Sequence, residues 1–297
     1  MATLREIRSR ISGVKNTQKI TKAMKMVAAA RLRRAQEAIF ATRPYARKIS
    51  QMLRHLVTTV DPSLHPLFAP REVHSVLYVV VTADRGLCGA FNTNIIKAAE
   101  HELKTNVADL MREGNVRLVT VGRKGSEYFG KRGYNLYARH VGIFSDLEFQ
   151  KARGIIDEIT AGYGKGEFDR VVLIYNEFKS VIQQKIVIEQ LLPVPPEDTR
   201  PEEKSSRAQV DYIYEPSSRE IINALVPKHL NFQMWRVLLE SNAAEQGARM
   251  SAMDNATENA KEIIRDLSLS FNNARQAAIT KELLEIVGGA EALKKAG

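Results

Sequence analysis

The chain has 297 residues, 44% of them hydrophobic and 26% charged, which is typical of globular proteins and excludes collagen-like or low-complexity classes. The single cysteine, Cys88, excludes an internal disulfide framework, and no apolar run approaches the roughly 20 residues that a membrane-spanning helix needs. The formal net charge of +10 is concentrated in residues 1–56, which hold 14 Lys and Arg against two acids, while the rest of the chain sums to −2.

This basic segment carries a heptad pattern that predicts one strand of a coiled coil. Its polar positions Gln18, Thr21 and Lys25 fall together, and Pro44 predicts a kink near Arg43. A transit peptide would not keep such a repeat for about 50 residues, so nucleic-acid binding, binding to an anionic membrane and a solvated helical face stay open for the basic charges. The predicted seam is Leu4, Ile7, Ile11, Val14, Gln18, Thr21, Lys25, Ala28, Leu32, Ala35, Ile39, Thr42, Ala46, Ile49, Leu53 and Leu56.

The other end of the chain has a second seam. No Gly or Pro interrupts the stretch between Gly247 and Gly288, and the pattern predicts a helix that begins near residue 218. Two seams at opposite ends of one chain favour an antiparallel pair within the molecule, with an intermolecular coiled coil as the alternative. The predicted seam positions are Met250, Met253, Thr257, Ala260, Ile264, Leu267, Phe271, Ala274 and Ala278.

The middle of the chain changes to the period of strands. Five strand-like segments are predicted at 73–81, 116–122, 134–142, 169–178 and 181–194. Helix-like stretches at 92–113, 123–132 and 146–162 separate the first four, which indicates a mostly parallel sheet flanked by helices. The last two strands are close enough to form a hairpin at the sheet edge, and the Pro-rich segment 193–209 predicts an exposed loop.

The predicted fold is therefore an α/β domain combined with a long antiparallel coiled coil. Residues 1–58 form the N-terminal coiled-coil helix, 72–215 the central α/β domain, and 216–297 the C-terminal helix that pairs with 1–58.

Motifs for catalysis are missing. The first strand-to-helix loop, TADRGLCGAFNTN at 82–94, has neither a dinucleotide-binding glycine pattern nor a P-loop. A tight turn is the favoured interpretation of its glycines, with a protein-contact loop and a small-ligand or phosphate site as alternatives. Asp84 and Arg85 at its tip are interpreted as a loop ion pair, and Cys88 as a small buried hydrophobic residue. The six histidines lack metal-ligand spacing. We expect no cofactor, no metal and no catalysis by this chain alone.

Three stretches resemble one known family. They are NTQKITKAMKMVAAARLRRAQ (16–36), DRGLCGAFN (84–92), and ARMSAMDNATENAKEII (248–264) continuing to NNARQAAITKELLEIVGGAEAL (272–293). In order and spacing they resemble the gamma subunit of F-type ATP synthase, the central rotor shaft, over essentially the full chain. The N-terminal seam starts at Leu4 and no cysteine pair is present, so we expect a bacterial type without a presequence or a thiol switch.

The resemblance implies a non-catalytic role in a larger assembly. The two terminal helices would form a shaft inside a ring of alpha and beta subunits, and the α/β domain would touch the epsilon subunit and the membrane c-subunit ring. Ion flow through the c ring would turn the shaft and drive ATP synthesis in the beta subunits, with hydrolysis as the reverse. The chain would occur in one copy per complex, without nucleic acid, as a peripheral protein on the cytoplasmic face of the bacterial cell membrane.

The resemblance also implies roles for single residues. Contacts with beta subunits are expected from Arg275, Gln276, Thr280, Arg85, Met24 and Lys25, and contacts with the c ring or epsilon from Tyr212 and Glu215. The apolar tip LLEIVGG is expected to turn in an apolar sleeve, because apolar contacts have no preferred direction. The alternative is an independent coiled-coil scaffold with an α/β ligand-binding domain, which would form a homodimer and bind DNA in a salt-sensitive manner.

Overall fold

A computed structural model describes residues 3–59, 66–69, 71–181, 183–195 and 218–296. The chain divides into two compact units, Met1–Val27 with Met250–Gly297 (unit 1) and Ala28–Arg249 (unit 2). Both units contain a part of the long helices α1 (Leu4–Thr59) and α6 (Ser218–Ala296). The division of the chain into 1–58, 72–215 and 216–297 stays a prediction.

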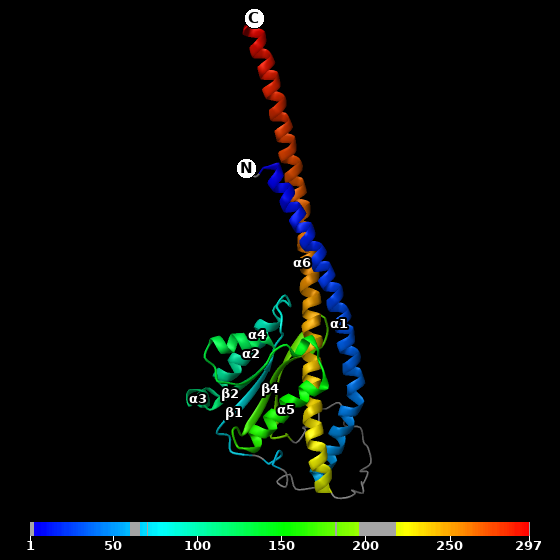
Figure 1. Cartoon of the computed structure of the whole chain (residues 1–297), viewed down its shortest axis with the longest axis vertical. Coiled ribbons are helices and arrows are strands. Elements are labelled where there is room, and N and C mark those ends of the chain that lie inside the picture. Colours follow the sequence, from blue (N-terminus) through cyan, green and yellow to red (C-terminus); the bar gives the residue numbers. More distant parts are fainter. Residues whose placement is uncertain (1–2, 60–65, 70, 182, 196–217, 297) are drawn as a thin grey trace. The chain divides into compact units, whose positions relative to one another are not determined.

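Unit 1 is a pair of unlike helices, α1 and α6, that lie side by side (Figure 1). As the residue number rises along α1, the number of the partner residue on α6 falls, so the two helices are antiparallel. The cross-helix pairs are Arg8 with the ring of Phe271, Thr21 with Thr257, and Lys25 with Asp254. The pairing within one chain is therefore the arrangement that the two seams favour.

The N-terminal seam is confirmed residue by residue. All 14 predicted positions from Leu4 to Ile49 are buried or half-buried, whereas Ile20 and Val27, which lie off the seam, are 59% and 54% exposed. The side chains of Leu53 and Leu56 lie outside the described residues. Helix α1 continues through Pro44.

Unit 2 contains a five-stranded sheet in the order β3-β2-β1-β4-β5. Its strands are β1 (Val76–Val81), β2 (Val116–Val121), β3 (Leu136–His140), β4 (Arg170–Phe178) and β5 (Gln184–Leu192). The first four are parallel, and β5 pairs with β4 in the antiparallel direction as the edge hairpin. Strand β1, VLYVVV, is buried at every position, as expected for the centre of a sheet covered on both faces.

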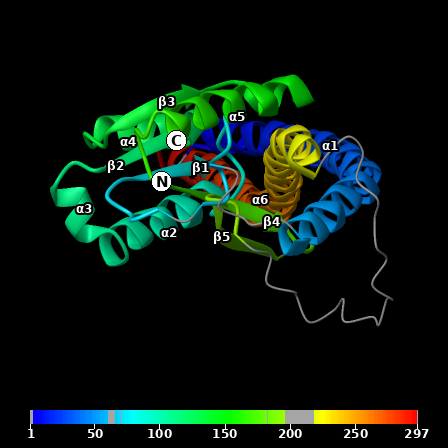
Figure 2. The same cartoon turned by 90° about the horizontal axis from the view of Figure 1, so that it is seen from below.

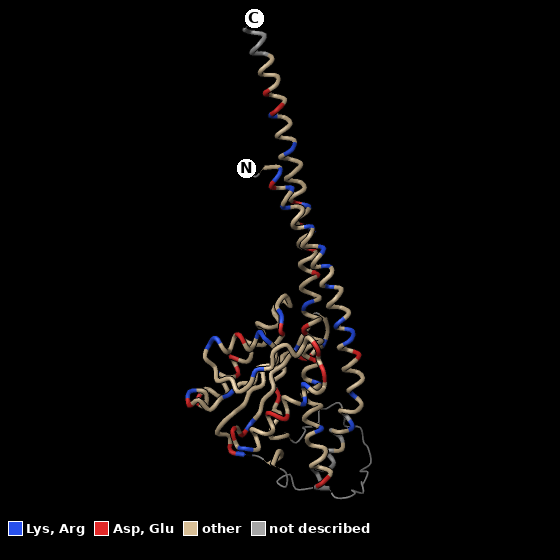
Figure 3. Tube along the Cα trace, viewed as in Figure 1, with Lys and Arg blue, Asp and Glu red and all other residues tan. Residues whose placement is uncertain are grey.

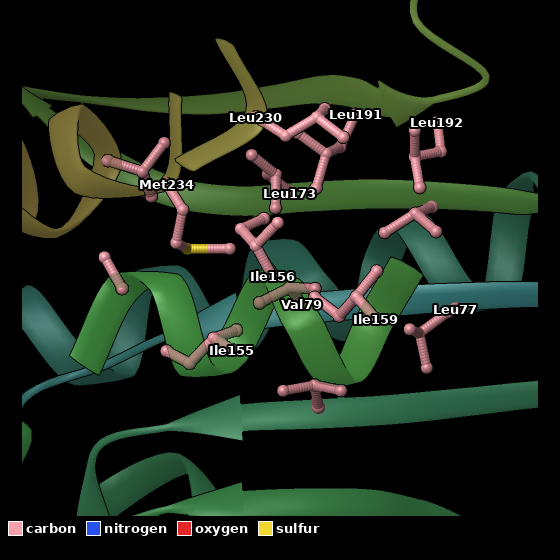
Figure 4. Close-up of a cluster of buried hydrophobic side chains, with 14 of the residues drawn as sticks. Leu77, Val79, Ile155, Ile156, Ile159, Leu173, Leu191, Leu192, Leu230 and Met234 are labelled. Carbon is pink, nitrogen blue, oxygen red and sulfur yellow. The ribbon is translucent and has the colours of Figure 1, made fainter. Parts of the chain in front are cut away.

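Helices cover both faces of this sheet (Figure 2). The helices other than α1 and α6 are α2 (Phe91–Thr105), α3 (Ala108–Arg112), α4 (Arg123–Lys131) and α5 (Phe149–Gly164), so the predicted helix at 92–113 is two helices. Helices α2, α3 and α4 pack on one face. Helix α5 and the first part of α6 pack on the other, where Ile156, Val79, Leu173 and Met234 share one apolar core (Figure 4).

His229 in α6 predicts a pH dependence of stability. Burial, together with the nearby charge of Arg236, lowers the pKa of His229 from 6.5 to about 4. Because the unfolded chain takes up this proton at a higher pH than the folded chain does, acid favours unfolding, by about 2 kcal/mol between pH 7 and pH 5. We expect His229→Gln to remove this part of the pH dependence in urea denaturation curves recorded at both pH values.

Two other buried groups act in the opposite direction. Burial raises the pKa of Glu240 and of Glu245, so the penalty for their charges is relieved as pH falls. Both carboxyl groups are present in the wild-type chain and in the variant, so the difference between the two curves isolates His229. An unchanged pH dependence in the variant would contradict the assignment.

Candidate functional site

The described residues hold neither a metal centre nor a membrane span. No group of three or more His, Cys, Asp or Glu side chains among them is placed to hold a metal ion. Within the same residues, no helix combines the length and the apolar character needed to cross a bilayer. The candidate functional features are the loop at 82–94 and the exposed faces of α1 and α6.

The loop at 82–94 follows β1 at the carboxyl end of the parallel sheet. The chain order along the sheet reverses at β1, between β2 and β4, and α/β sheets usually bind ligands outside the strand ends at such a point. In this chain the negatively charged group at that point is a side chain of the loop itself. The carboxylate of Asp84 accepts the backbone N–H groups of Arg123 at 3.0 Å, Gly142 at 2.8 Å and Phe144 at 3.2 Å.

The role of Asp84 therefore differs from the predicted loop ion pair with Arg85. Its oxygens join three loops of the sheet edge, because the N–H groups that they accept follow β2 and β3. The turn that follows β2 also lies close to the end of β1. A Cβ on Gly122, at φ +92°, would lie 2.1 Å from the carbonyl oxygen of Thr82, and Gly125 donates its N–H to the Thr82 hydroxyl at 2.8 Å. Glycine is needed for this approach.

Helix α6 closes the other side of the loop. Cys88 is 2% exposed and packs with Phe91 against Ala244 and Ala248 of the helix. The thiol is a small buried group, as predicted, and burial raises its pKa. The small side chains of α6 let the helix approach the strand ends, at the place where related sheet architectures hold a ligand.

A buried ion pair ties the loop to α6. Arg249 pairs with Glu245 one turn earlier in the helix, and their side chains are only 10% and 6% exposed. The same guanidinium donates to the carbonyl oxygen of Gly86 at 3.1 Å. Because the Gly86 carbonyl belongs to the residue after Arg85, this contact fixes the backbone that carries the predicted contact residue.

Arg85 itself is exposed at the tip of the loop. Its carbonyl oxygen accepts the amide of Asn92 at 3.5 Å, which holds the backbone, while the described part of the chain gives its guanidinium no ion pair. The side chain is thus presented to solvent from a rigid base. An arginine so placed is available for a carboxylate of another molecule.

The C-terminal part of α6 in unit 1 carries a second exposed group of predicted contacts. Arg275, Gln276 and Thr280 are all exposed, and the Thr280 hydroxyl donates to the carbonyl oxygen of Gln276 at 2.9 Å within the helix. In the described residues, neither Arg275 nor the amide of Gln276 has a side-chain partner. These three residues lie on about one turn and a half of helix, so one partner segment can reach them all.

The apolar tip follows directly on the same helix. Four large apolar side chains of the tip are more than half exposed. They are Leu283, Leu284, Ile286 and Val287, at 57%, 67%, 64% and 56%. Such a group of exposed apolar side chains is unusual on the surface of a soluble protein that has no partner there. Their exposure in the isolated chain agrees with a partner that covers them.

Met24 and Lys25 lie on α1 in unit 1 and are half-buried. Lys25 is on the predicted seam, and its ammonium group lies 2.5 Å from a carboxylate oxygen of Asp254 on α6. The side chains of the pair are 40% and 49% exposed, so this cation is already compensated inside the chain, which the sequence did not reveal. Other Lys and Arg residues recur along α1 with few acidic residues between them (Figure 3).

The predicted contact residues are divided between the two units. Arg85 belongs to unit 2, whereas Met24, Lys25, Arg275, Gln276 and Thr280 belong to unit 1. Tyr212 and Glu215 lie outside the described residues. Sequence reasoning missed Arg249 and assigned Asp84 a different role. The spacing of Glu245 and Arg249 is typical of a helical ion pair, but no local pattern reveals that Gly86 is its third member.

The chain matches known proteins over almost its whole length. A family model described as ATP synthase matches residues 3–293. An ATP synthase gamma chain from Chlorobaculum tepidum is 57% identical over 296 residues, covering 99% of this chain and 100% of the relative. One from Chloroherpeton thalassium is 55% identical over 302 residues, covering 99% of both, and one from Salinibacter ruber is 48% identical over 308 residues, covering 100% of both.

Solved structures share the fold. A chain from the central stalk and c ring of the Tetrahymena thermophila mitochondrial ATP synthase has a TM-score of 0.60 and 25% identity, covering 80% of this chain and 99% of that chain. A chain from the OSCP, F1 and c-ring assembly of the Euglena gracilis mitochondrial ATP synthase has a TM-score of 0.66 and 21% identity, covering 98% and 94%. The family match over residues 3–293 and bacterial relatives more than half identical lead to one conclusion: the chain belongs to the family of ATP synthase gamma chains.

Proposed function

We propose that this chain is the non-catalytic central-stalk rotor subunit of an F-type ATP synthase. It couples ion flow through a membrane c ring to sequential conformational changes in catalytic beta subunits, and the direction reverses when ATP is hydrolysed. Its partners are alpha, beta and epsilon subunits and the c ring, with one copy per complex. It is held at the cytoplasmic face of the bacterial cell membrane through these partners.

The observation that carries this proposal is the pairing of two unlike helices in unit 1. A rotor must offer different contacts at each angle, because a partner changes its conformational equilibrium only through differential contacts. A pair of α1 and α6 from one chain presents such unequal faces, whereas a symmetric homodimer repeats the same face. Family membership and the exposed tip of α6 support the same role.

Contact roles follow from the exposure of each side chain. We assign Arg275, Gln276 and Thr280 to a loop of one beta subunit and Arg85 to an acidic beta residue. Met24 contributes an adaptable apolar contact.

Lys25 requires a different mechanism. Its ion pair with Asp254 is half exposed, so replacing this contact by water costs little free energy. Lys25 can therefore leave Asp254 when an acidic beta segment passes. Tyr212 and Glu215 are assigned to the c ring or epsilon from the family resemblance.

Reconstitution tests the role directly. Bacterial alpha and beta subunits are assembled with and without this chain, and ATP hydrolysis is measured at saturating ATP. We expect turnover to rise at least about tenfold when the chain is present, because sequential catalysis needs the differential contacts of a rotor.

The isolated chain serves as the control, and we expect it to hydrolyse no ATP. Turnover by the isolated chain would point to an enzyme, and salt-sensitive DNA binding by a dimer of the chain would favour the scaffold alternative. Unchanged hydrolysis on adding the chain to alpha and beta subunits would refute the rotor assignment.

A further inference from the structure

A polar cluster joins α6 to the edge hairpin of the sheet in unit 2. The guanidinium of Arg236 donates to Glu189 of β5 at 2.6 Å and to the hydroxyl of Tyr175 on β4 at 3.0 Å. Gln233, one turn earlier in α6, accepts from the same guanidinium at 3.1 and 2.9 Å and holds it in place. One side chain of the helix is thereby hydrogen-bonded to both strands of the hairpin.

The next turn of α6 adds a second connection. Glu240 is 7% exposed, and its carboxylate accepts the backbone N–H of Phe178, near the end of β4, at 3.2 Å. Residues 236 and 240 are four apart and therefore lie on the same face of the helix. We call Arg236, Glu240, Tyr175, Glu189 and the Phe178 backbone N–H the hairpin clasp.

Apart from the contact of Arg249 with the Gly86 carbonyl, the other contacts between α6 and the sheet domain in the described residues are mostly apolar. Leu230, Met234, Val237 and Leu238 belong to the core that α6 shares with β1, β4 and α5. Contacts of this kind stabilise the assembly, but they have little directional preference and do not fix the positions of single atoms. Hydrogen bonds weaken steeply when donor and acceptor are turned out of line.

From this contrast we propose that the hairpin clasp, with Arg236 at its centre, is the positioning element that carries torque between the sheet domain and α6. The proposal rests on the rotor function proposed above. In that function the sheet domain meets the c ring while the helix pair reaches the beta subunits, so rotation has to pass from the sheet to the two shaft helices, and the hairpin holds α6 by directional hydrogen bonds.

Stability alone does not account for the clasp. The side chains of Arg236 and Glu189 are 28% and 26% exposed, and ion pairs of this kind contribute little to stability against apolar replacements of similar volume. What such buried polar groups do provide is a single register of the elements that they join. A defined register between helix and sheet is the property that torque transfer needs.

The test uses the complete ATP synthase in sealed vesicles with Arg236→Met in this chain. ATP hydrolysis is measured with the membrane uncoupled, and the steady-state pH gradient driven by ATP is measured in intact vesicles. We expect hydrolysis to stay at the wild-type level. The ratio of the gradient to hydrolysis should fall by a factor of about two to five, the range that an ion pair of this exposure supports.

The matched control is Arg117→Met. Arg117 pairs with Glu167 at 3.4 Å with side chains 36% and 31% exposed, and its guanidinium lies 6.0 Å from the ring of Tyr137, much as that of Arg236 lies 5.7 Å from Tyr175. This pair lies inside the sheet domain and does not touch α6. A purely structural loss in either variant should lower hydrolysis and pumping in proportion, leaving their ratio unchanged.

A second variant, Glu189→Gln, keeps the proposal testable if the complex with Arg236→Met does not assemble. Glu189→Gln keeps an acceptor on β5 but removes its charge, so we expect a smaller fall in the same ratio, again with normal hydrolysis. Equal ratios in wild type, Arg236→Met and Arg117→Met, or in wild type and Glu189→Gln if Arg236→Met does not assemble, would overturn the clasp. A wild-type chain that fails to stimulate hydrolysis would instead refute the rotor function itself.

Discussion

Replacing Arg275 and Gln276 together by alanine is expected to lower ATP hydrolysis by reconstituted alpha, beta and gamma-type subunits about tenfold or more, because each lost hydrogen bond to a charged partner is worth about 1.5–3 kcal/mol. Both side chains are exposed on α6, and the described residues offer them no side-chain partner. The expected loss is therefore a loss of contact with another subunit. Steady-state hydrolysis at saturating ATP measures it.

Stability and a neighbouring pair provide the controls. Since neither side chain packs inside the chain, the free energy of unfolding should stay within about 0.5 kcal/mol of the wild-type value. Arg265→Ala with Asp266→Ala removes two adjacent charged side chains, 83% and 73% exposed, from an earlier part of the same helix. We expect this control to hydrolyse ATP normally. Equal losses in both double variants would argue against a specific contact at Arg275 and Gln276.

Arg249→Met is expected to destabilise the chain by about 3 kcal/mol, because removal of one partner leaves the other charge of a buried pair uncompensated. Glu245 is buried, and burial raises its pKa while the charge of Arg249 opposes that rise. Loss of Arg249 should raise that pKa further. The Gly86 carbonyl also loses its donor, so the loop that presents Arg85 is released as well.

The pH dependence identifies the cause of this loss. A carboxyl group whose pKa is raised in the folded state destabilises the fold above that pKa, and the penalty disappears as pH falls through it. The deficit of Arg249→Met, measured by urea denaturation, should therefore shrink in acid. The double variant Arg249→Met with Glu245→Met should recover most of the stability at neutral pH. A deficit independent of pH and kept by the double variant would indicate lost packing instead.

Much of the architecture follows from periodicity. The seven-residue repeat placed every described seam position of α1 correctly, since a helix pair buries the same stripe wherever its partner lies. The second seam is buried or half-buried from Met250 to Ala274, and only Ala278 is exposed. The strand segments and the edge hairpin were likewise predictable, because continuous apolar runs such as VLYVVV are typical of strands buried on both faces.

The sequence could not predict which distant groups meet. Asp84 was interpreted as one half of a loop ion pair, yet its carboxylate accepts N–H groups from loops about 40 and 60 residues further on. Lys25 forms an ion pair with Asp254, 229 residues further on, which no local pattern predicts. A polar partner is chosen by geometry across elements, and neighbouring residues in the sequence do not encode that geometry.

By itself, the amino-acid sequence determined the class of each element, the buried stripes of the long helices and, through its motifs, the family resemblance. These properties depend on local spacing, which side-chain periodicity records directly. Only the tertiary structure decided that Arg249 holds the loop of Arg85 and that Arg236 joins α6 to both strands of the hairpin. Directional hydrogen bonds require atoms within about 3 Å, and only the packing of the sheet against α6 brings residues so far apart in the chain to that distance.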